Sequence, residues 1–112
     1  MEDPWLLRFT IEGGENPETP VTFLCSGYVA PGEALTRFRE QADRFAEAGR
    51  DIVLDFAHVT GMHREGIGVL ITLKEKVKKQ GQSCVLRNPS KRVIELLKVI
   101  RLAPYFEVQA GG

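Results

Sequence analysis

The sequence predicts an α/β fold, a single domain with a mixed, mainly parallel sheet packed against helices. Strand-like apolar runs alternate along the chain with segments of helical periodicity, an order typical of crossover units and parallel sheets. Glycine and proline separate these segments, as they do at the ends of helices and strands. The 112 residues suffice for one hydrophobic core but not for two. We therefore expect one domain over residues 1–112, with its core at about 5–108.

The first quarter of the chain predicts two strands. Residues Trp5–Ile11 alternate well enough for a first strand, and a loop rich in strand breakers follows over residues 13–17. Val21–Cys25 predicts the second strand, which Ser26 and Gly27 end. Because a short loop joins these two strands, they are candidates for an antiparallel pair at one edge of the sheet.

A helix is predicted between Pro31 and Gly49. Its apolar stripe consists of Leu35, Phe38, Ala42 and Phe45. Charged residues occupy the remaining positions, which is the pattern of a helix laid on a core.

Residues 51–81 organise the rest of the chain. Ile52–Leu54, extended by Phe56, is a continuous apolar run, which is typical of a strand covered on both faces. A short irregular crossing follows, and then a helix that ends at Gly81. The stripe predicted for this helix is Ile67, Leu70, Ile71, Lys74 and Val77.

The last third of the chain predicts a strand, a helix and a short terminal strand. Cys84–Leu86 reads as a buried strand, and Ser90 is a plausible N-cap for the helix after it. That helix places Val93, Leu96, Leu97 and Ile100 on one face. Pro104 prevents it from continuing far, and Tyr105–Val108 is expected to form the last strand.

Composition narrows the function classes. Lys plus Arg and Asp plus Glu number 15 each, so no bulk charge indicates nucleic acid as a partner. The apolar runs are far shorter than a membrane helix needs, so direct membrane insertion is not expected. The start of the chain lacks the order of a signal peptide. Cys25 and Cys84 both fall in predicted core strands, where free thiols behave as small hydrophobic groups. We expect a reduced, cytoplasmic protein.

The motifs that could carry chemistry are incomplete. His63 and Glu65 form an H-x-E pair, but the P-C-x-x-C element of zinc deaminases is missing. With two histidines in the chain, no metal site is expected. Gly66 and Gly68 lack the third glycine of a dinucleotide fingerprint, and close packing of the helix start is the better explanation for them. No serine has a partner at a spacing that implies a nucleophile. We predict no enzymatic activity and no cofactor.

The segment His63–Gly66, at the positive end of the central helix, is the first candidate for a functional site. Backbone N–H groups of a first helical turn are unpaired and favour negative charge, so a hydroxyl there makes a good phosphorylation switch. In this chain Glu65, a permanent carboxylate, fills that position. The plainer interpretation is that Glu65 only stabilises the helix, by about 0.3–1 kcal/mol.

The segment DFAHVTGMHREGIGVL, residues 55–70, resembles the signature of STAS domains, the fold of bacterial anti-sigma-factor antagonists. The family pattern D-L-S-x-V-x-F-I-D-S-S-G-I-G-V-L fits without a gap. The matching positions are Asp55, Val59, Gly66, Ile67, Gly68, Val69 and Leu70, together with Gly27 of a G-x-L-D element. The resemblance covers nearly the whole chain. It implies a STAS-like sandwich of sheet and helices that binds a partner protein rather than catalysing a reaction.

This chain departs from the family pattern at the residues through which phosphorylation switches the family's binding. The D-S-S of the family is here His63-Arg64-Glu65, so Glu65 replaces the phosphorylated serine. Ala30 replaces the acid of G-x-L-D. Glutamate cannot accept a phosphate, and its single charge mimics only part of the nearly two charges of phosphoserine.

We therefore predict a non-phosphorylatable STAS domain that regulates a partner-switching pathway of sigma factors. The expected partner is an anti-sigma factor or serine kinase, or another STAS-type protein, and a homodimer is an open alternative. The recognition surface is expected on the loop from His58 to Glu65 and the exposed face of the second helix. Its candidate residues are His58, Thr60, Met62, His63, Arg64, Glu65 and Gly66. For Met62 a place in the core is the stronger alternative, and Thr60 is a second candidate phosphosite.

Two other functions stay open. The chain could be an accessory STAS subunit of a membrane transporter for lipids or anions. It could also be a module that binds a small ligand or nucleotide, although the loss of the acid at Ala30 argues against this.

Overall fold

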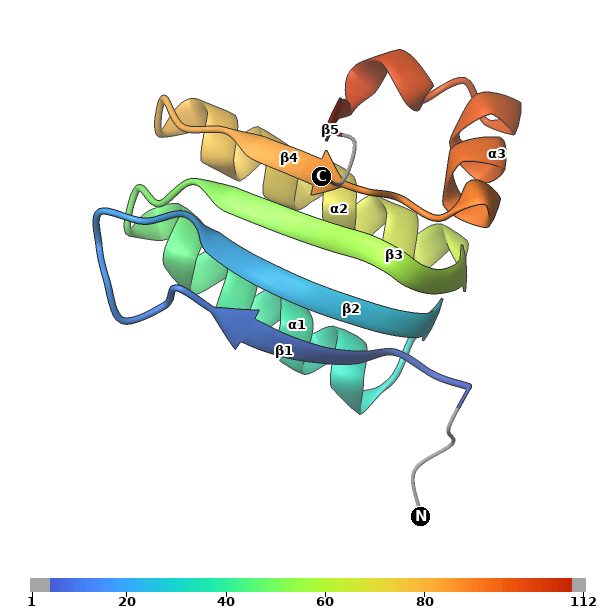
Figure 1. The fold of residues 1–112 in the computed structure, drawn as a ribbon, viewed down its shortest axis with the longest axis horizontal. Coiled ribbons are helices and arrows are strands. Elements are labelled where there is room, and N and C mark those ends of the chain that lie inside the picture. Colours follow the sequence, from blue (N-terminus) through green and yellow to red (C-terminus); the bar gives the residue numbers. More distant parts are fainter. Residues whose placement is uncertain (1–4, 110–112) are drawn as a thin grey trace.

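The computed structural model describes residues 5–109. The elements follow one another as β1 (Arg8–Glu12), β2 (Val21–Val29), α1 (Glu33–Glu47), β3 (Ile52–Met62), α2 (Arg64–Lys79), β4 (Cys84–Arg87), α3 (Lys91–Val99), the short 3-10 helix η1 (Ala103–Tyr105) and β5 (Glu107–Gln109) (Figure 1). The strands form one sheet in the order β1-β2-β3-β4-β5. β1 pairs with β2 antiparallel, and the other neighbours are parallel. The predicted α/β class and the antiparallel edge are confirmed.

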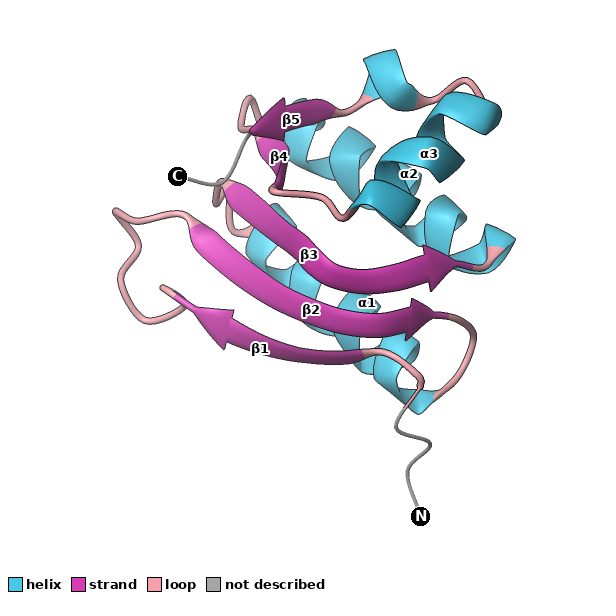
Figure 2. Ribbon diagram, turned by 45° about the vertical axis from the view of Figure 1, so that its right-hand side comes forward, coloured by secondary structure: helices cyan, strands magenta, loops and turns pink. Residues whose placement is uncertain are grey.

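Both long helices, α1 and α2, lie on one face of the sheet (Figures 1 and 2). The order β2-β3-β4 proceeds in one direction, so right-handed crossovers place both connecting helices on the same side. The opposite face is called the open face below. Ile52, Leu54 and Phe56 are buried beneath the helices, whereas Val53 and Asp55 between them are partly exposed. The expectation that this strand is covered on both faces is therefore wrong.

The core lies between the sheet and the helices. Four phenylalanine side chains from β1, β2 and α1 pack together at its β1 end, namely Phe9, Phe23, Phe38 and Phe45. The tightest contact, between Phe23 and Phe38, has ring centroids 5.1 Å apart in an edge-on geometry. Aromatic pairs of this kind stabilise a core by about 0.5–1.5 kcal/mol beyond the area they bury. The predicted stripe of α1 accordingly faces the sheet.

β2 and β3 are both longer than predicted. β2 continues through Ser26 and Gly27 to Val29, and β3 continues to Met62, so the expected irregular crossing before α2 is a strand. The two strands pair along this extension with two register irregularities. The Tyr28 ring packs against Gly61, because a Cβ added at residue 61 would stand only 3.2 Å from two atoms of that ring.

The start of α3 occupies the place beside β3 that β4 leaves vacant. β4 pairs only with the first part of β3, as far as Asp55. Beyond it, the Ser90 N–H donates to the carbonyl of Phe56 at 3.1 Å, and the Ser90 hydroxyl donates to the carbonyl of Val59 at 2.6 Å. The same hydroxyl oxygen accepts from the Val93 N–H at 3.3 Å, so the predicted N-cap is confirmed.

The loop between β1 and β2 is held by Arg50, which lies just before β3. Its guanidinium donates to four backbone carbonyls, those of Gly13, Gly14, Asn16 and Thr19, at 2.6–3.2 Å. The same group lies over the ring of Phe45, 5.6 Å from its centroid. Arg50 thereby fixes the loop to the end of α1.

The C-terminal elements differ slightly from the prediction. Pro104 and Tyr105 belong to η1, so the last strand, β5, starts at Glu107 rather than at Tyr105. In α2 the buried stripe is Gly66, Leu70, Leu73 and Val77. Leu73 was missed, and Ile67 and Ile71 are only partly buried.

Candidate functional site

The start of α2 is fixed by hydrogen bonds of His63. Its Nδ1 atom accepts from the Glu65 N–H at 3.1 Å, which caps one of the unpaired N–H groups of the first turn. Its own N–H donates to the carbonyl of Val29 at 2.8 Å. His63 thus joins α2 to the carboxyl end of β2. This role was not predicted, because histidine is not among the favoured N-cap residues.

Gly66 brings the first turn of α2 against β2. A Cβ added at this position would stand 2.7 Å from the carbonyl oxygen and from the Cγ1 atom of Val29. A Cβ added at Gly68 would meet nothing within 4 Å. Close packing therefore explains the first glycine of the G-x-G pair but not the second.

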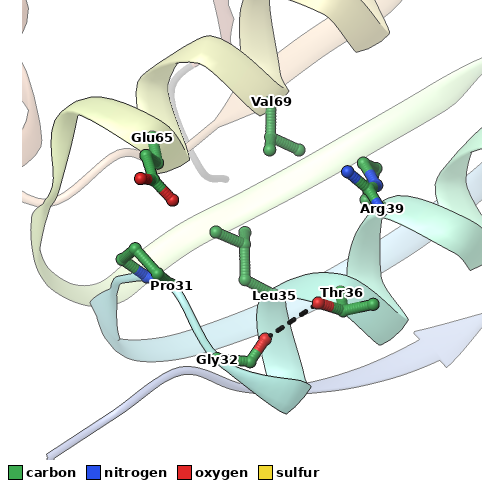
Figure 3. Close-up of a pocket in the computed structure, with 7 residues that line it drawn as sticks. All are labelled: Pro31, Gly32, Leu35, Thr36, Arg39, Glu65 and Val69. Carbon is green, nitrogen blue, oxygen red and sulfur yellow. Dashed lines mark hydrogen bonds between the residues drawn. The ribbon is translucent and has the colours of Figure 1, made fainter.

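Glu65 lies in a groove between α1 and α2 (Figure 3). The groove is lined by Pro31, Gly32, Leu35, Thr36 and Arg39 on one side and by Glu65 and Val69 on the other. In Figure 3 Glu65 and Val69 project from α2 towards the side chains of α1. The Glu65 side chain is exposed, and within residues 5–109 its carboxylate has no hydrogen-bond or ion-pair partner. The groove thus presents an acid, a base and the apolar side chains of Pro31 and, in part, Val69 to solvent, while Leu35 is buried at its floor.

The structure divides the predicted site residues. Arg64 and Glu65 are exposed at the start of α2, and His63 beside them is half-buried. Met62 is only 6% exposed and belongs to the core, which confirms the stronger alternative for this residue and contradicts its place among the candidate contacts. Gly66 is buried against Val29 and can shape the site only through the backbone. The loop expected from His58 to Glu65 is strand as far as Met62.

His58 and Thr60 belong to a different surface. Both are exposed and line a hollow at the end of β2 and β3, together with Tyr28, Ala57, Val59, Ser90 and Arg92. No residue of this hollow lines the groove of Glu65. The structure therefore contains two candidate surfaces where the sequence predicted one.

The α1 residues that line the groove were not predicted from the sequence. Leu35 and Arg39 stand one helical turn apart, as expected of neighbours on one helix face. Nothing in the sequence says which face of α1 adjoins the start of α2, because that depends on the sheet order.

Neither cysteine is suited to chemistry. Burial raises the pKa of the Cys84 thiol to about 11, and the positive charge of Lys74 only partly opposes this shift. Burial, with a smaller contribution from the negative charge of Asp55, also raises the pKa of Cys25. Both thiols are therefore neutral near pH 7 and poor nucleophiles.

Across residues 5–109 no group of three or more His, Cys, Asp and Glu side chains could hold a metal ion. In the same part of the chain, no helix has the length and apolar character needed to cross a membrane.

A mainly parallel sheet with both long helices on one face and an exposed helix start beside α1 is the architecture of a STAS domain. The sequence model of the STAS domain matches residues 33–110, and the chain belongs to this family. The expectation drawn from the sequence signature is thereby confirmed.

One relative of this chain is an anti-sigma-factor antagonist. The anti-sigma-B factor antagonist of Bacillus subtilis (strain 168) is 35% identical over 72 residues, which cover 64% of this chain and 66% of that protein. The match thus spans just under two thirds of the relative's length.

Solved structures of such antagonists share the fold. Unphosphorylated SpoIIAA superimposes with a TM-score of 0.76 at 19% identity, covering 94% of this chain and 89% of that one. The phosphorylated form of SpoIIAA, a Bacillus protein, gives 0.73 at 17% identity, covering 94% and 92%. An anti-sigma factor antagonist from Mycobacterium paratuberculosis gives 0.72 at 17% identity, covering 97% and 90%.

Proposed function

We propose that this chain is a partner-binding STAS domain of the anti-sigma-factor antagonist kind that works without phosphorylation at the start of α2. The proposed partner is an anti-sigma factor or serine kinase, met in the cytoplasm, and the chain itself performs no catalysis. The observation that carries this proposal is the position of Glu65. It is an exposed carboxylate in the first turn of α2, beside a groove, where the family signature has its phosphorylated serine.

The groove supports binding of a protein segment. Glu65 and Arg39 offer opposite charges, and the exposed Pro31 and partly exposed Val69 offer apolar contact. Charges of both signs around an apolar centre fix the register and orientation of a partner. The N-cap of His63 and the close packing of Gly66 hold Glu65 on a rigid element. A carboxylate at residue 65 offers a serine kinase no hydroxyl group to phosphorylate, so the charge of this surface is constant in the proposed mode of action.

Affinity capture from a lysate of the source organism tests the proposal. The wild-type protein is compared with Glu65→Lys and with a matched control, Glu95→Lys, whose side chain is exposed on α3. We expect mass spectrometry to identify an anti-sigma factor with the wild type and the control, and its loss with Glu65→Lys. Equal capture by all three variants contradicts the assignment of this site.

A Glu65→Ser variant tests whether a kinase still recognises the domain. Phosphorylation of residue 65 by the captured kinase would show that a single residue prevents switching. Capture of the same transporter proteins by the wild type and Glu65→Ser, with no anti-sigma factor among them, would instead favour the transporter-subunit function.

A further inference from the structure

On the open face, acidic and basic residues occupy different positions along the strands. At the amino ends of β2 to β4, one row of paired residues runs Glu12, Thr22, Val53, Val85 and Glu107. The next row runs Thr10, Leu24, Asp55, Arg87 and Gln109. The third row, nearest the carboxyl ends of β2 and β3, contains Arg8, Ser26 and His58. Residues paired across neighbouring strands point to the same face, so each row lies side by side on the open face.

The charge therefore changes sign along this face. The outer positions of the first row are the acids Glu12 and Glu107. In the second row, Asp55 is neutralised by Arg87, whose guanidinium donates two hydrogen bonds to one carboxylate oxygen at 3.0 and 3.2 Å. The third row carries Arg8 and His58 and no acid.

Two hollows meet at His58. One lies over β1 and β2 and is lined by Arg8, Phe9, Thr10, Leu24, Cys25, Ser26 and His58. The other is the hollow of Tyr28, Thr60, Ser90 and Arg92 already described. Arg8 and Arg92 thus stand on either side of His58. Within residues 5–109 neither arginine forms an ion pair, and no carboxylate lines either hollow.

We infer that this basic surface, defined by Arg8, His58 and Arg92, is a second docking site, which receives an acidic segment of a partner protein. Charge complementarity selects the occupant, because two unpaired arginines flank hydroxyl groups and an exposed imidazole. Ser26, Tyr28 and Thr60 line the same hollows, and hydroxyl groups of this kind can donate hydrogen bonds to carboxylates. The face is open rather than enclosed, which fits an extended protein segment better than a small molecule.

This site is distinct from the groove of Glu65. The groove lies between the helices that cover the other face of the sheet, and the two surfaces share no residue. A partner that contacts both would meet an acid at α2 and bases on the open face. The inference does not depend on the function proposed for Glu65.

Binding of a fluorescein-labelled decaglutamate peptide at low ionic strength tests the inference. Fluorescence anisotropy gives the dissociation constant for the wild type and for the double variant Arg8→Glu, Arg92→Glu. The matched control reverses two charges on α2 in the double variant Lys78→Glu, Lys79→Glu. Both lysines are exposed in the last turn of that helix. We expect the first pair to raise the dissociation constant about tenfold or more and the control to change it less than about threefold. Far-UV circular dichroism and thermal unfolding establish that each variant is folded.

Chemical-shift mapping by NMR locates the peptide. We expect the largest shifts at Arg8, Ser26, His58 and Arg92. Shifts centred on the last turn of α2, or no binding of the peptide, overturn the inference. Equal affinity for an oligothymidylate of the same charge also overturns it, since the surface would then bind any polyanion. So does a change of oligomeric state in the arginine variant, measured by sedimentation, because a second copy of the chain would then be the occupant.

Discussion

The backbone of Gly66 lies so close to Val29 that a Cβ at position 66 would stand 2.7 Å from two atoms of that residue. Gly66→Ala must therefore push α2 away from β2, and we expect it to lower the free energy of unfolding by about 1–3 kcal/mol. Urea denaturation measures this change. Gly68→Ala is the control. It lies in the same helix with open space around it, and it should stabilise the protein by about 0.5–1 kcal/mol. Equal effects of the two substitutions would contradict the close packing described above.

Removing the N-cap of α2 should destabilise the start of that helix while leaving the charge of Glu65 unchanged. His63→Ala deletes the acceptor of the Glu65 N–H, and we expect a loss of about 1 kcal/mol in the free energy of unfolding. His63→Asn should retain most of the stability, because asparagine is a good N-cap. Thermal unfolding checks both, with the exposed His58→Ala as the control, expected to be within about 0.5 kcal/mol of the wild type. A result in which His63→Ala matches His58→Ala contradicts the capping role.

Arg50 cannot be replaced by lysine without cost. A lysine keeps the positive charge but lacks the planar guanidinium that reaches four carbonyls at once. We expect Arg50→Lys to destabilise the domain by about 2 kcal/mol, measured by urea denaturation. Arg44→Lys, at an exposed position in the last turn of α1, should change stability by less than about 0.5 kcal/mol. Loss of equal size in both variants would show that the loop is not held by these hydrogen bonds.

The buried Cys84 thiol predicts a loss of stability in alkali. Its pKa is raised from 9.0 to about 11 in the folded protein. Below pH 9 the thiol keeps its proton in both the folded and the unfolded state, so its contribution to the free energy of unfolding is fully present. Between pH 9 and about 11 only the folded state keeps it, so the free energy of unfolding falls as pH rises. We expect Cys84 to account for a decline of about 2 kcal/mol between pH 8 and pH 10.5.

The comparison that isolates this contribution uses Cys84→Ala. Substitution lowers stability at every pH, but the decline between pH 8 and pH 10.5 should become shallower in denaturation experiments. Parallel curves for the wild type and the variant would show that the decline comes from other groups.

Local signals in the sequence were sufficient for much of the fold. The stripe of α1, the N-cap at Ser90 and the end of α1 near Gly49 were predicted correctly, because each depends on residues close together in the chain. The ends of β2 and β3 were not. Gly27 and Gly61 are strand breakers by composition, but each strand supplies the other with hydrogen bonds, and the Tyr28 ring covers Gly61. Pairing between distant segments thus overrode the local preference.

The candidate site was predicted only in part. Glu65 was found because the signature fixes its position relative to Gly66. The α1 residues of the groove and the second surface around Arg8 and Arg92 were not found, since they depend on which strands are neighbours. For Met62 the core was the stronger of the two alternatives predicted, and the buried side chain at the end of β3 confirms it.

The hydrogen bonds of Arg50 also bear on how the loop between β1 and β2 can vary in sequence. Arg50 binds the loop only through carbonyl oxygens, which every residue possesses. It therefore recognises the path of the chain and not the side chains along it. Glu15, Pro17 and Glu18 can be exchanged as long as that path is kept, whereas Gly13, with φ 78°, must keep its conformational freedom. Part of what shapes this loop, besides the hydrogen bonds of its own Asn16 and Thr19 side chains, therefore comes from a residue more than 30 positions further along the chain.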